Sequence, residues 1–302
     1  MFMKKNSLFV FIIILLTILL IIFSIIYFNK NKHHVRSIDT IKYKHFLRTK
    51  IWENVLRVYG LSIAESIFPK TYILPKDTNS FIKDETSNKE YIVKTLYSGE
   101  RAGVFLYEPQ MKHNLDKYAV IQEYIKNPLL INGYKFDTRI FMVIDCNKGI
   151  YLYKKGYNVY TYDPFDYKSN KRSQKINQTY TNDDHYVNNK LPKTTDDLLL
   201  HNVPYDKVIY DVAIKLRYII NATPQITCSN INKIYGLDVE ILDNFSTKII
   251  EINADPSLDF KDSLWKEKLI QGLYDEMNSY ESNSWIQLVN SSHLTKTPIV
   301  KI

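Results

Sequence analysis

Residues 120–145 read VIQEYIKNPLLINGYKFDTRIFMVID and combine two strand-like stretches with a polar turn between them. In the second stretch, Lys135, Asp137 and Arg139 alternate with uncharged residues. Because successive side chains of a strand point to opposite faces, the three charges share one face. A solvated face is the ordinary explanation. The charges, however, lead directly into the apolar run IFMVI, and such a row suits an ATP site that needs cations and a ribose acceptor.

Two further segments suit the binding of a nucleotide. The first stretch ends in a tetrapeptide that can present backbone groups to the edge of an adenine ring, Gln122-Glu123-Tyr124-Ile125. Upstream, Lys94 lies in the strand-like segment YIVKTLY and precedes a loop that contains Gly99 and Gly103. Loop amides can surround phosphates while an ammonium group neutralises their charge. Since an exposed strand lysine is usually solvated, this signal predicts a phosphate site only in combination with other motifs.

A third group of polar residues lies in YGLDVEILD and KIIEINADPSL, residues 235–243 and 248–258. Glu251 and Asn253 share one face of the second strand candidate, and Asp238 lies in the neighbouring one. Carboxylate and amide oxygens are hard ligands that suit Mg²⁺ bridging phosphates. An edge hairpin with scattered charge is the alternative. An acid and an amide between isoleucines favour the metal site.

The remaining chain mixes strand and helix signals, which predicts an α+β fold. Extended segments are expected in FPKTYILP, YIVKTLY, VFLYE, YAVIQEYI, RIFMVID, GIYLYKKG, LDVEIL and KIIEIN. Helices are expected over residues 41–58, 206–221 and about 261–280. Residues 166–200 are polar and lack clear periodicity, so a loop is expected there.

Residues 8–28, LFVFIIILLTILLIIFSIIYF, predict an uncleaved transmembrane helix. A helix of this length spans roughly 30 Å, the thickness of the hydrocarbon core, and no small-residue cleavage site follows it. Basic residues are more numerous on its C-terminal side, which predicts a single-pass membrane protein with its main domain facing the cytoplasm. Four glycosylation sequons argue the other way; they begin at Asn177, Asn221, Asn244 and Asn290.

The predicted domain organisation follows from these segments. A short tail covers residues 1–7, the membrane anchor covers 8–28, a linker covers 29–37 and a folded domain covers 38–302. The formal net charge of +8 leaves two explanations open, solubility or an acidic partner. No dense Lys/Arg block occurs, and no nucleic acid is expected as a partner. Neither a zinc-ligand spacing nor a Ser/His or Cys/His nucleophile motif is recognisable.

Together these segments resemble the tubulin–tyrosine ligase family, including its ligase-like glutamylases and glycylases. The matching strings occur in family order over about residues 66–275: FPKTYILP, the Lys94 strand, VIQEYIKNPLLINGYKFDTRIF, HYVNN, YGLDVEILD and IIEINADPSL. The resemblance implies an ATP-grasp fold, in which nucleotide lies between two α+β lobes. It also implies ATP and Mg²⁺ as cofactors. The implied reaction joins an amino acid (glutamate, glycine or tyrosine) to a carboxylate of an acidic protein tail, tubulin or tubulin-like, through an acyl phosphate.

The resemblance also assigns roles to individual residues. The implied nucleotide-binding residues are Lys94, Gln122, Tyr124, Ile125, Lys135 and Asp137. Arg139 and Glu251 are the expected catalytic residues, with Arg139 contacting the reacting phosphoryl group or the amino-acid carboxylate. The expected Mg²⁺ ligands are Asp238, Glu251 and Asn253. His185 and Asn188 fall where the family has a His-x-Thr-Asn motif.

One departure from the family pattern leaves the function open. The family usually has an arginine soon after the glycine of KKGYNVYTY, and Val159 stands near that place. The protein is expected to be an active ligase acting on a protein tail, because the metal-binding set is retained. The alternatives are a catalytically degenerate ATP-grasp domain that binds a partner at a membrane, and an ATP-grasp enzyme that joins a different carboxylate and amine.

Overall fold

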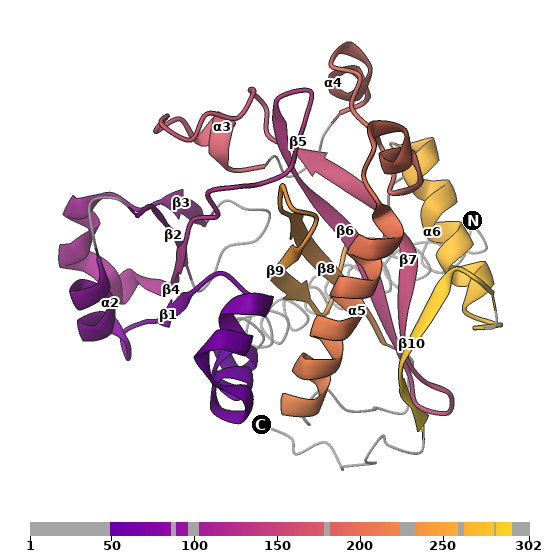
Figure 1. Ribbon diagram of the computed structural model, residues 1–302, viewed down its shortest axis with the longest axis horizontal. Helices are drawn as coiled ribbons and strands as arrows, with labels where there is room; N and C mark the ends of the chain where they lie inside the picture. Colours follow the sequence, from indigo (N-terminus) through magenta and orange to yellow (C-terminus); the bar gives the residue numbers. More distant parts are fainter. Residues whose placement is uncertain are drawn as a thin grey trace, which may run out of the picture. The chain divides into compact units, whose positions relative to one another are not determined.

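The computed structural model of the protein describes residues 49–85, 89–95, 103–177, 182–223, 233–258, 263–280 and 282–291. All of them belong to one compact unit, Lys44–Ile302. The predicted tail, membrane anchor and linker lie outside the described residues. Helices and sheets are mixed within the unit, as the α+β prediction requires (Figure 1).

The smaller sheet has the strand order β1-β4-β2-β3. Its strands are β1 (Thr71–Ile73), β2 (Tyr91–Thr95), β3 (Val104–Leu106) and β4 (Tyr118–Glu123). Every neighbouring pair is antiparallel. Helix α2 (Thr78–Asp84) inserts Phe81 between the rings of Tyr72 and Tyr91 in edge-to-face contacts. This aromatic cluster fixes one face of the sheet, and the sheet positions Lys94 on β2 and Gln122 on β4.

The larger sheet has the order β10-β7-β6-β8-β9, with the short β5 paired to β6. Its strands are β5 (Leu130–Ile131), β6 (Tyr134–Asp145), β7 (Gly149–Tyr160), β8 (Lys233–Ile241), β9 (Thr247–Asn253) and β10 (Trp285–Asn290). All neighbouring strands are antiparallel. The chain crosses from the smaller to the larger sheet through the segment between β4 and β6, which contains β5. The predicted charged strand, β6, is the central strand of the larger sheet.

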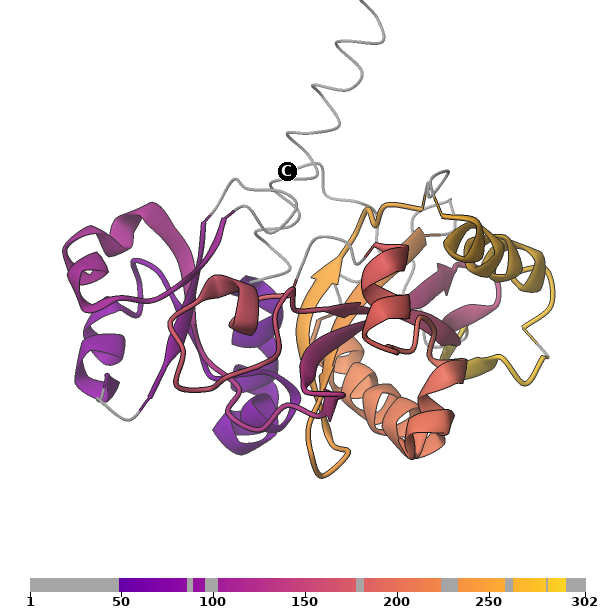
Figure 2. The same ribbon diagram turned by 90° about the horizontal axis from the view of Figure 1, so that it is seen from above.

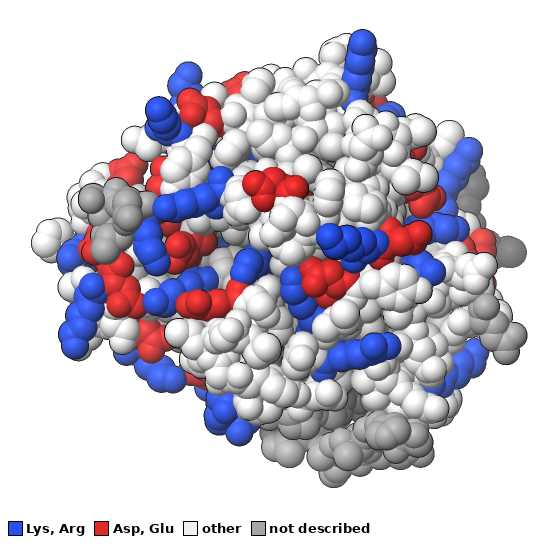
Figure 3. Space-filling view, viewed as in Figure 1, with Lys and Arg blue, Asp and Glu red and all other residues white. Residues whose placement is uncertain are grey.

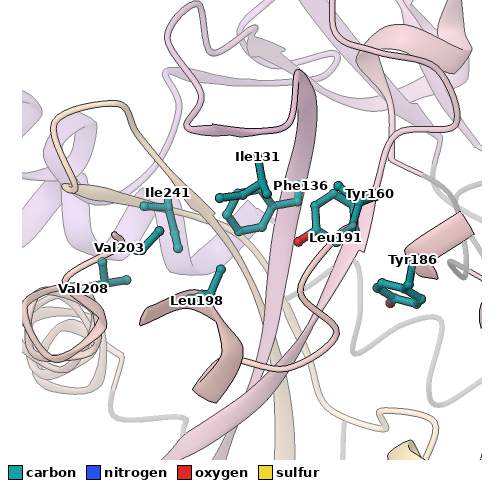
Figure 4. Packing of buried hydrophobic residues seen from close by; sticks show 9 residues of the cluster. All are labelled: Ile131, Phe136, Tyr160, Tyr186, Leu191, Leu198, Val203, Val208 and Ile241. Atoms are coloured by element: carbon teal, nitrogen blue, oxygen red, sulfur yellow. The ribbon is translucent and has the colours of Figure 1, made fainter. Parts of the chain in front are cut away.

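Helices cover both faces of the larger sheet, with α5 (Tyr205–Ala222) and α6 (Leu264–Glu276) on opposite sides (Figure 2). On the α5 side, Phe136 and Ile241 pack with Val208 in a buried cluster (Figure 4). On the α6 side, Phe141 packs against Leu273 in a second cluster. Because alternate residues of β6 enter different clusters, the charged face of this strand shares its side with α6.

The sequence predicted most of these elements but missed structure in the polar region. The expected loop 166–200 contains α3 (Arg172–Lys175), α4 (Asp183–Asn188) and the 3₁₀ helix η2 (Asp196–His201). Strand β10 was also not predicted, and neither was the 3₁₀ helix η1 (Pro109–Lys117). The expected helix 41–58 is described from residue 49 and continues to residue 67. Short elements of this kind lack the periodicity on which sequence interpretation depends.

The expected localisation, a single-pass membrane protein, needs correction. Within the part of the chain that the structure describes, no helix is long and apolar enough to cross a membrane. Helix α5 has enough residues, but its 18 residues include five charged ones: Asp206, Lys207, Asp211, Lys215 and Arg217. Charged side chains at that density are incompatible with a lipid-facing span. The predicted anchor, residues 8–28, lies outside the described residues.

Candidate functional site

A pocket lies where strands of the two sheets meet. Its walls come from β2 and β4 of the smaller sheet and from β6, β8 and β9 of the larger one, and its volume is about 640 Å³ including space open to solvent. Most residues predicted for the site line it: Lys94, Gln122, Tyr124, Ile125, Lys135, Asp137, Asp238 and Glu251. The two others, Arg139 and Asn253, are each hydrogen-bonded to the lining residue Asp238.

Three predicted residues form a row across neighbouring strands. Arg139 on β6 is the register partner of Asp238 on β8, which in turn is the partner of Glu251 on β9. Arg139 Nε donates a hydrogen bond to Asp238 Oδ1 at 2.6 Å. Burial alone would lower the pKa of Arg139, but the Asp238 carboxylate outweighs burial and raises this pKa above its ordinary value. The guanidinium therefore stays charged at the edge of the pocket.

A glycine makes room for this arginine. A Cβ on Gly236 would lie 3.2 Å from both Cδ and Nη1 of Arg139 and 2.9 Å from Cβ of Pro256. Contacts this short force neighbouring atoms to move. The glycine of YGLDVEILD thus lets the Arg139 side chain lie flat across β8 and reach Asp238.

The predicted Mg²⁺ ligands are brought together by the register of β8 and β9. Asp238 pairs with Glu251, and Gly236 pairs with Asn253. Asn253 Nδ2 lies 3.5 Å from Asp238 Oδ2. In the described parts of the chain no group of three or more His, Cys, Asp or Glu side chains could hold a metal ion. The set here has two carboxylates and one amide, a donor set that fits Mg²⁺ with additional water or phosphate oxygens.

The opposite end of the pocket holds a second acidic group around Lys135. Lys135 Nζ lies 3.0 Å from Glu240 Oε2 and 3.7 Å from Asp137 Oδ1. Glu240 is 3% exposed and is the register partner of Asp137. Burial raises the pKa of Glu240 to about 7, opposed by Lys135 and assisted by Asp137. Two carboxylates thus share one lysine in a poorly solvated place.

Tyr124 connects this acidic group to a segment of the polar region. Its hydroxyl donates to the Lys175 carbonyl at 2.9 Å, and its ring lies 5.4 Å from Lys175 Nζ. Lys175 is 1% exposed and pairs with Glu90 Oε2 at 2.5 Å. Lys175, Ile176 and Asn177 all line the pocket. The aromatic side chain and the flanking cations make this end suitable for a planar base.

At the other end of the pocket, Lys94 reaches from the smaller sheet to the larger one. It is 4% exposed, and its Nζ lies 3.5 Å from the Ile250 carbonyl of β9. The ammonium group thus lies close to the strand that carries Glu251. Gly99, which the phosphate-loop prediction requires, falls outside the described residues.

Sequence reasoning missed several residues of the pocket. Glu240 could have been found, since it lies two positions after Asp238 on the same strand face. Lys175 and Asn177 gave no signal, because their segment has no periodicity. Conversely, His185 does not line the pocket: its ring contacts Tyr134 and Tyr162, and its Nε2 lies 3.1 Å from the Thr161 carbonyl.

The position of the missing family arginine is occupied by the hydrophobic core. Val159 lies opposite Asp137 in the register of β6 and β7, is 5% exposed, and belongs to the cluster beneath α6. The two nearest lysines of the same strand are engaged elsewhere. Lys155 Nζ pairs with Glu276 at 3.1 Å, and Lys154 Nζ lies over the Tyr210 ring. Neither lysine lines the pocket.

Comparison with known proteins agrees with this arrangement. The model of the tubulin-tyrosine ligase family matches residues 29–279. The chain belongs to this family. Membership implies an ATP-grasp-like α+β fold, and the two sheets with a pocket between them fit that description. The assignment of individual residues to ATP or Mg²⁺ stays a prediction.

Similar family members include proteins named tubulin polyglutamylases. A probable tubulin polyglutamylase of Homo sapiens is 25% identical over 257 residues, which are 74% of this chain and 42% of that protein. A probable alpha-tubulin polyglutamylase of Tetrahymena thermophila is 26% identical over 249 residues, 68% of this chain and 59% of that protein. The chain thus spans less than two thirds of the length of these relatives.

Proposed function

We propose that this chain is an ATP-dependent ligase that joins an amino acid, glutamate, to a carboxylate of an acidic tail on tubulin or a tubulin-like protein. The observation that carries the proposal is the row Arg139–Asp238–Glu251 beside Lys94, which gathers two cations and two carboxylates at one end of the pocket. The relatives named tubulin polyglutamylases support the choice of glutamate and of tubulin.

The residues at this end fit Mg-ATP as the co-substrate. Asp238, Glu251 and Asn253 would hold Mg²⁺ through oxygen atoms, and Lys94 would neutralise phosphate charge. Bound Mg-ATP supplies the phosphoryl group that activates the acceptor carboxylate for attack by an amine. At the far end, Glu240 Oε1 is buried without a hydrogen-bond partner among the described residues, which is what a site shaped for a polar ligand shows.

The protein's own contribution is orientation and charge. Arg139 is fixed by Asp238, so its guanidinium is preorganised toward an anion without rotamer reorganisation. Its raised pKa keeps it charged throughout the physiological range. Lys94 is buried among apolar strands, where its charge acts in a weakly screened environment. No protein nucleophile is required in this scheme.

The basic character of the chain suits an acidic acceptor only weakly. On the face shown in Figure 3, Lys and Arg are interspersed with Asp and Glu rather than gathered into one patch. The net charge of +8 therefore acts as a diffuse attraction.

A second candidate function is a catalytically degenerate domain that binds nucleotide and a partner. Val159 in place of the family arginine favours it, as do Lys154 and Lys155, which contact Tyr210 and Glu276 instead of the pocket. Loss of one cation at such a site can lower the rate on the order of 10³-fold.

One experiment separates the two functions. The full chain is incubated with Mg-ATP, an acidic peptide and radiolabelled glutamate, glycine or tyrosine, and peptide-bound label is counted. We expect glutamate incorporation, lowered about 10²- to 10³-fold in Glu251→Gln with little change in melting temperature, because several kcal/mol of charge stabilisation are lost. Activity that survives Glu251→Gln contradicts the metal assignment. An inactive parent that gains activity as Val159→Arg identifies a degenerate enzyme.

A further inference from the structure

Glu240 is an unusual residue for the position it occupies. It lies near the C-terminal end of β8, is 3% exposed and lines the pocket. The segment that links β4 to β5 runs beside it, because the Leu129 amide donates to the Ile241 carbonyl at 2.8 Å. Glu240 therefore lies at the end of the pocket beside the β4–β5 connection, called the linker end here, where Tyr124 and Ile125 also line the wall.

The two oxygens of this carboxylate have different surroundings. Oε2 lies 3.0 Å from Lys135 Nζ and forms an ion pair with it. Oε1 is buried and has no hydrogen-bond partner among the residues that the structure describes. A buried acceptor without a donor is costly, and native proteins seldom keep such a group unless a ligand, an ion or a water molecule supplies the partner or the group has a catalytic role.

Asn177 gives an independent indication at the same end of the pocket. It is 3% exposed and lines the pocket, and within the described chain neither Nδ2 nor Oδ1 has a hydrogen-bond partner. An amide offers both donors and acceptors. A ligand with a mixed polar edge would satisfy both side chains, whereas a purely apolar group would leave both unsatisfied.

We propose that Glu240 recognises the base of the bound nucleotide, with Oε1 accepting a hydrogen bond from the exocyclic 6-amino group of adenine. This inference rests on the proposed function, since it concerns the nucleotide of the same site. Guanine would offer two adjacent donors, N1–H and the 2-amino group, to both oxygens of a carboxylate. Here Lys135 already binds Oε2, so Oε1 is the oxygen left without a partner among the described residues, and it matches a single amino group.

The test compares ATP with inosine triphosphate, which carries a 6-oxo group where adenine carries the amino group. Dissociation constants of the full chain for Mg-ATP and Mg-ITP are measured by calorimetry. Wild type is expected to prefer ATP about tenfold to hundredfold, the range for a hydrogen bond to a charged group, because the 6-oxo group faces a carboxylate oxygen. In Glu240→Gln the preference should fall to near one, since an amide can accept from an amino group or donate to an oxo group.

The ratio of the two constants is the deciding quantity, because loss of the Lys135 partner changes the affinity for both nucleotides alike. Glu240→Leu, which removes the acceptor without adding a donor, should also lower the ratio. Glu276→Gln is the matched control: this carboxylate pairs with Lys155 outside the pocket and should keep the wild-type ratio. A wild-type ratio retained in both Glu240 variants overturns the inference and leaves the ligase proposal standing. A wild-type chain that binds neither nucleotide overturns the ligase proposal and this inference together.

Discussion

The two ends of the pocket balance their charges differently. At the Lys94 end, Arg139 and Asp238 form a close pair, and Glu251 continues the row on the next strand. At the linker end, Asp137 and Glu240 share the cation Lys135. The first arrangement stabilises its charges within the protein. The second keeps an excess of buried acid, which burial opposes and a ligand can relieve.

The Lys94 end, where two cations and two carboxylates balance, is called the balanced end below. The largest expected effect comes from breaking its ion pair between Arg139 and Asp238. Arg139→Met leaves Asp238 as a buried carboxylate without its cation, and we expect the free energy of unfolding to fall by about 3–5 kcal/mol. Urea denaturation measures this loss. Arg217→Met is the control, because Arg217 is an exposed residue whose Nη2 donates to the Gln287 carbonyl at 3.0 Å. Its loss should cost less than about 1 kcal/mol.

A double variant sharpens this first prediction. Arg139→Met combined with Asp238→Leu removes both charges, so it should recover a large part of the stability that the single variant loses. If the double variant is as unstable as the sum of the two single variants, the pair makes no coupled contribution. The ion pair would then not be what stabilises this end of the pocket.

The balanced end was predictable from the sequence, whereas the linker end was only partly so. Its three charged residues lie on three different strands with strong apolar signals: Arg139, Asp238 and Glu251. Antiparallel pairing of these strands places the three residues in one row. Their convergence needed only the strand assignments and the order of the motifs.

The linker end needed information that a strand pattern does not contain. Lys175 and Asn177 reach the pocket from a polar region without periodicity, and only tertiary packing brings them to Tyr124. Val159 was suspected from its departure from the family pattern, but its place in the core beneath α6 depends on residues more than 100 positions away. Long-range packing of this kind has no local signal.

The next prediction concerns pH and the excess acid. The pKa of Glu240 is raised to about 7 in the folded protein, above its ordinary value of 4.5. Between these two values the unfolded chain has released a proton that the folded chain still binds, so stability falls as pH rises and levels off above pH 7. We expect wild type to lose about 1–3 kcal/mol between pH 5 and 8 from this group. Glu240→Gln should flatten that slope.

Glu276 provides a control with the opposite sign. Hydrogen bonds from serines and Lys155 outweigh burial and lower the pKa of Glu276 to about 2. Its stabilising contribution is present above pH 4.5 and is lost only as the pH falls toward 2. Glu276→Gln should therefore leave the slope between pH 5 and 8 as in wild type. A slope that Glu240→Gln does not change contradicts the description of the linker end as excess buried acid.

The smallest expected effect tests how tightly the balanced end is packed. In Gly236→Ala the new methyl group meets Pro256 at 2.9 Å and Arg139 at 3.2 Å, so both neighbours must move to make room for it. Overpacking of this kind costs about 1–2 kcal/mol. Gly272→Ala is the matched control on α6, where the added Cβ meets only the Tyr153 hydroxyl at 3.5 Å, an ordinary contact. Because alanine has a higher helix propensity than glycine, the free energy of unfolding of this control should rise by about 0.5–1 kcal/mol. Melting temperatures that move in opposite directions support a close approach of Arg139 to β8, whereas a neutral Gly236→Ala shows that the arginine has room to spare.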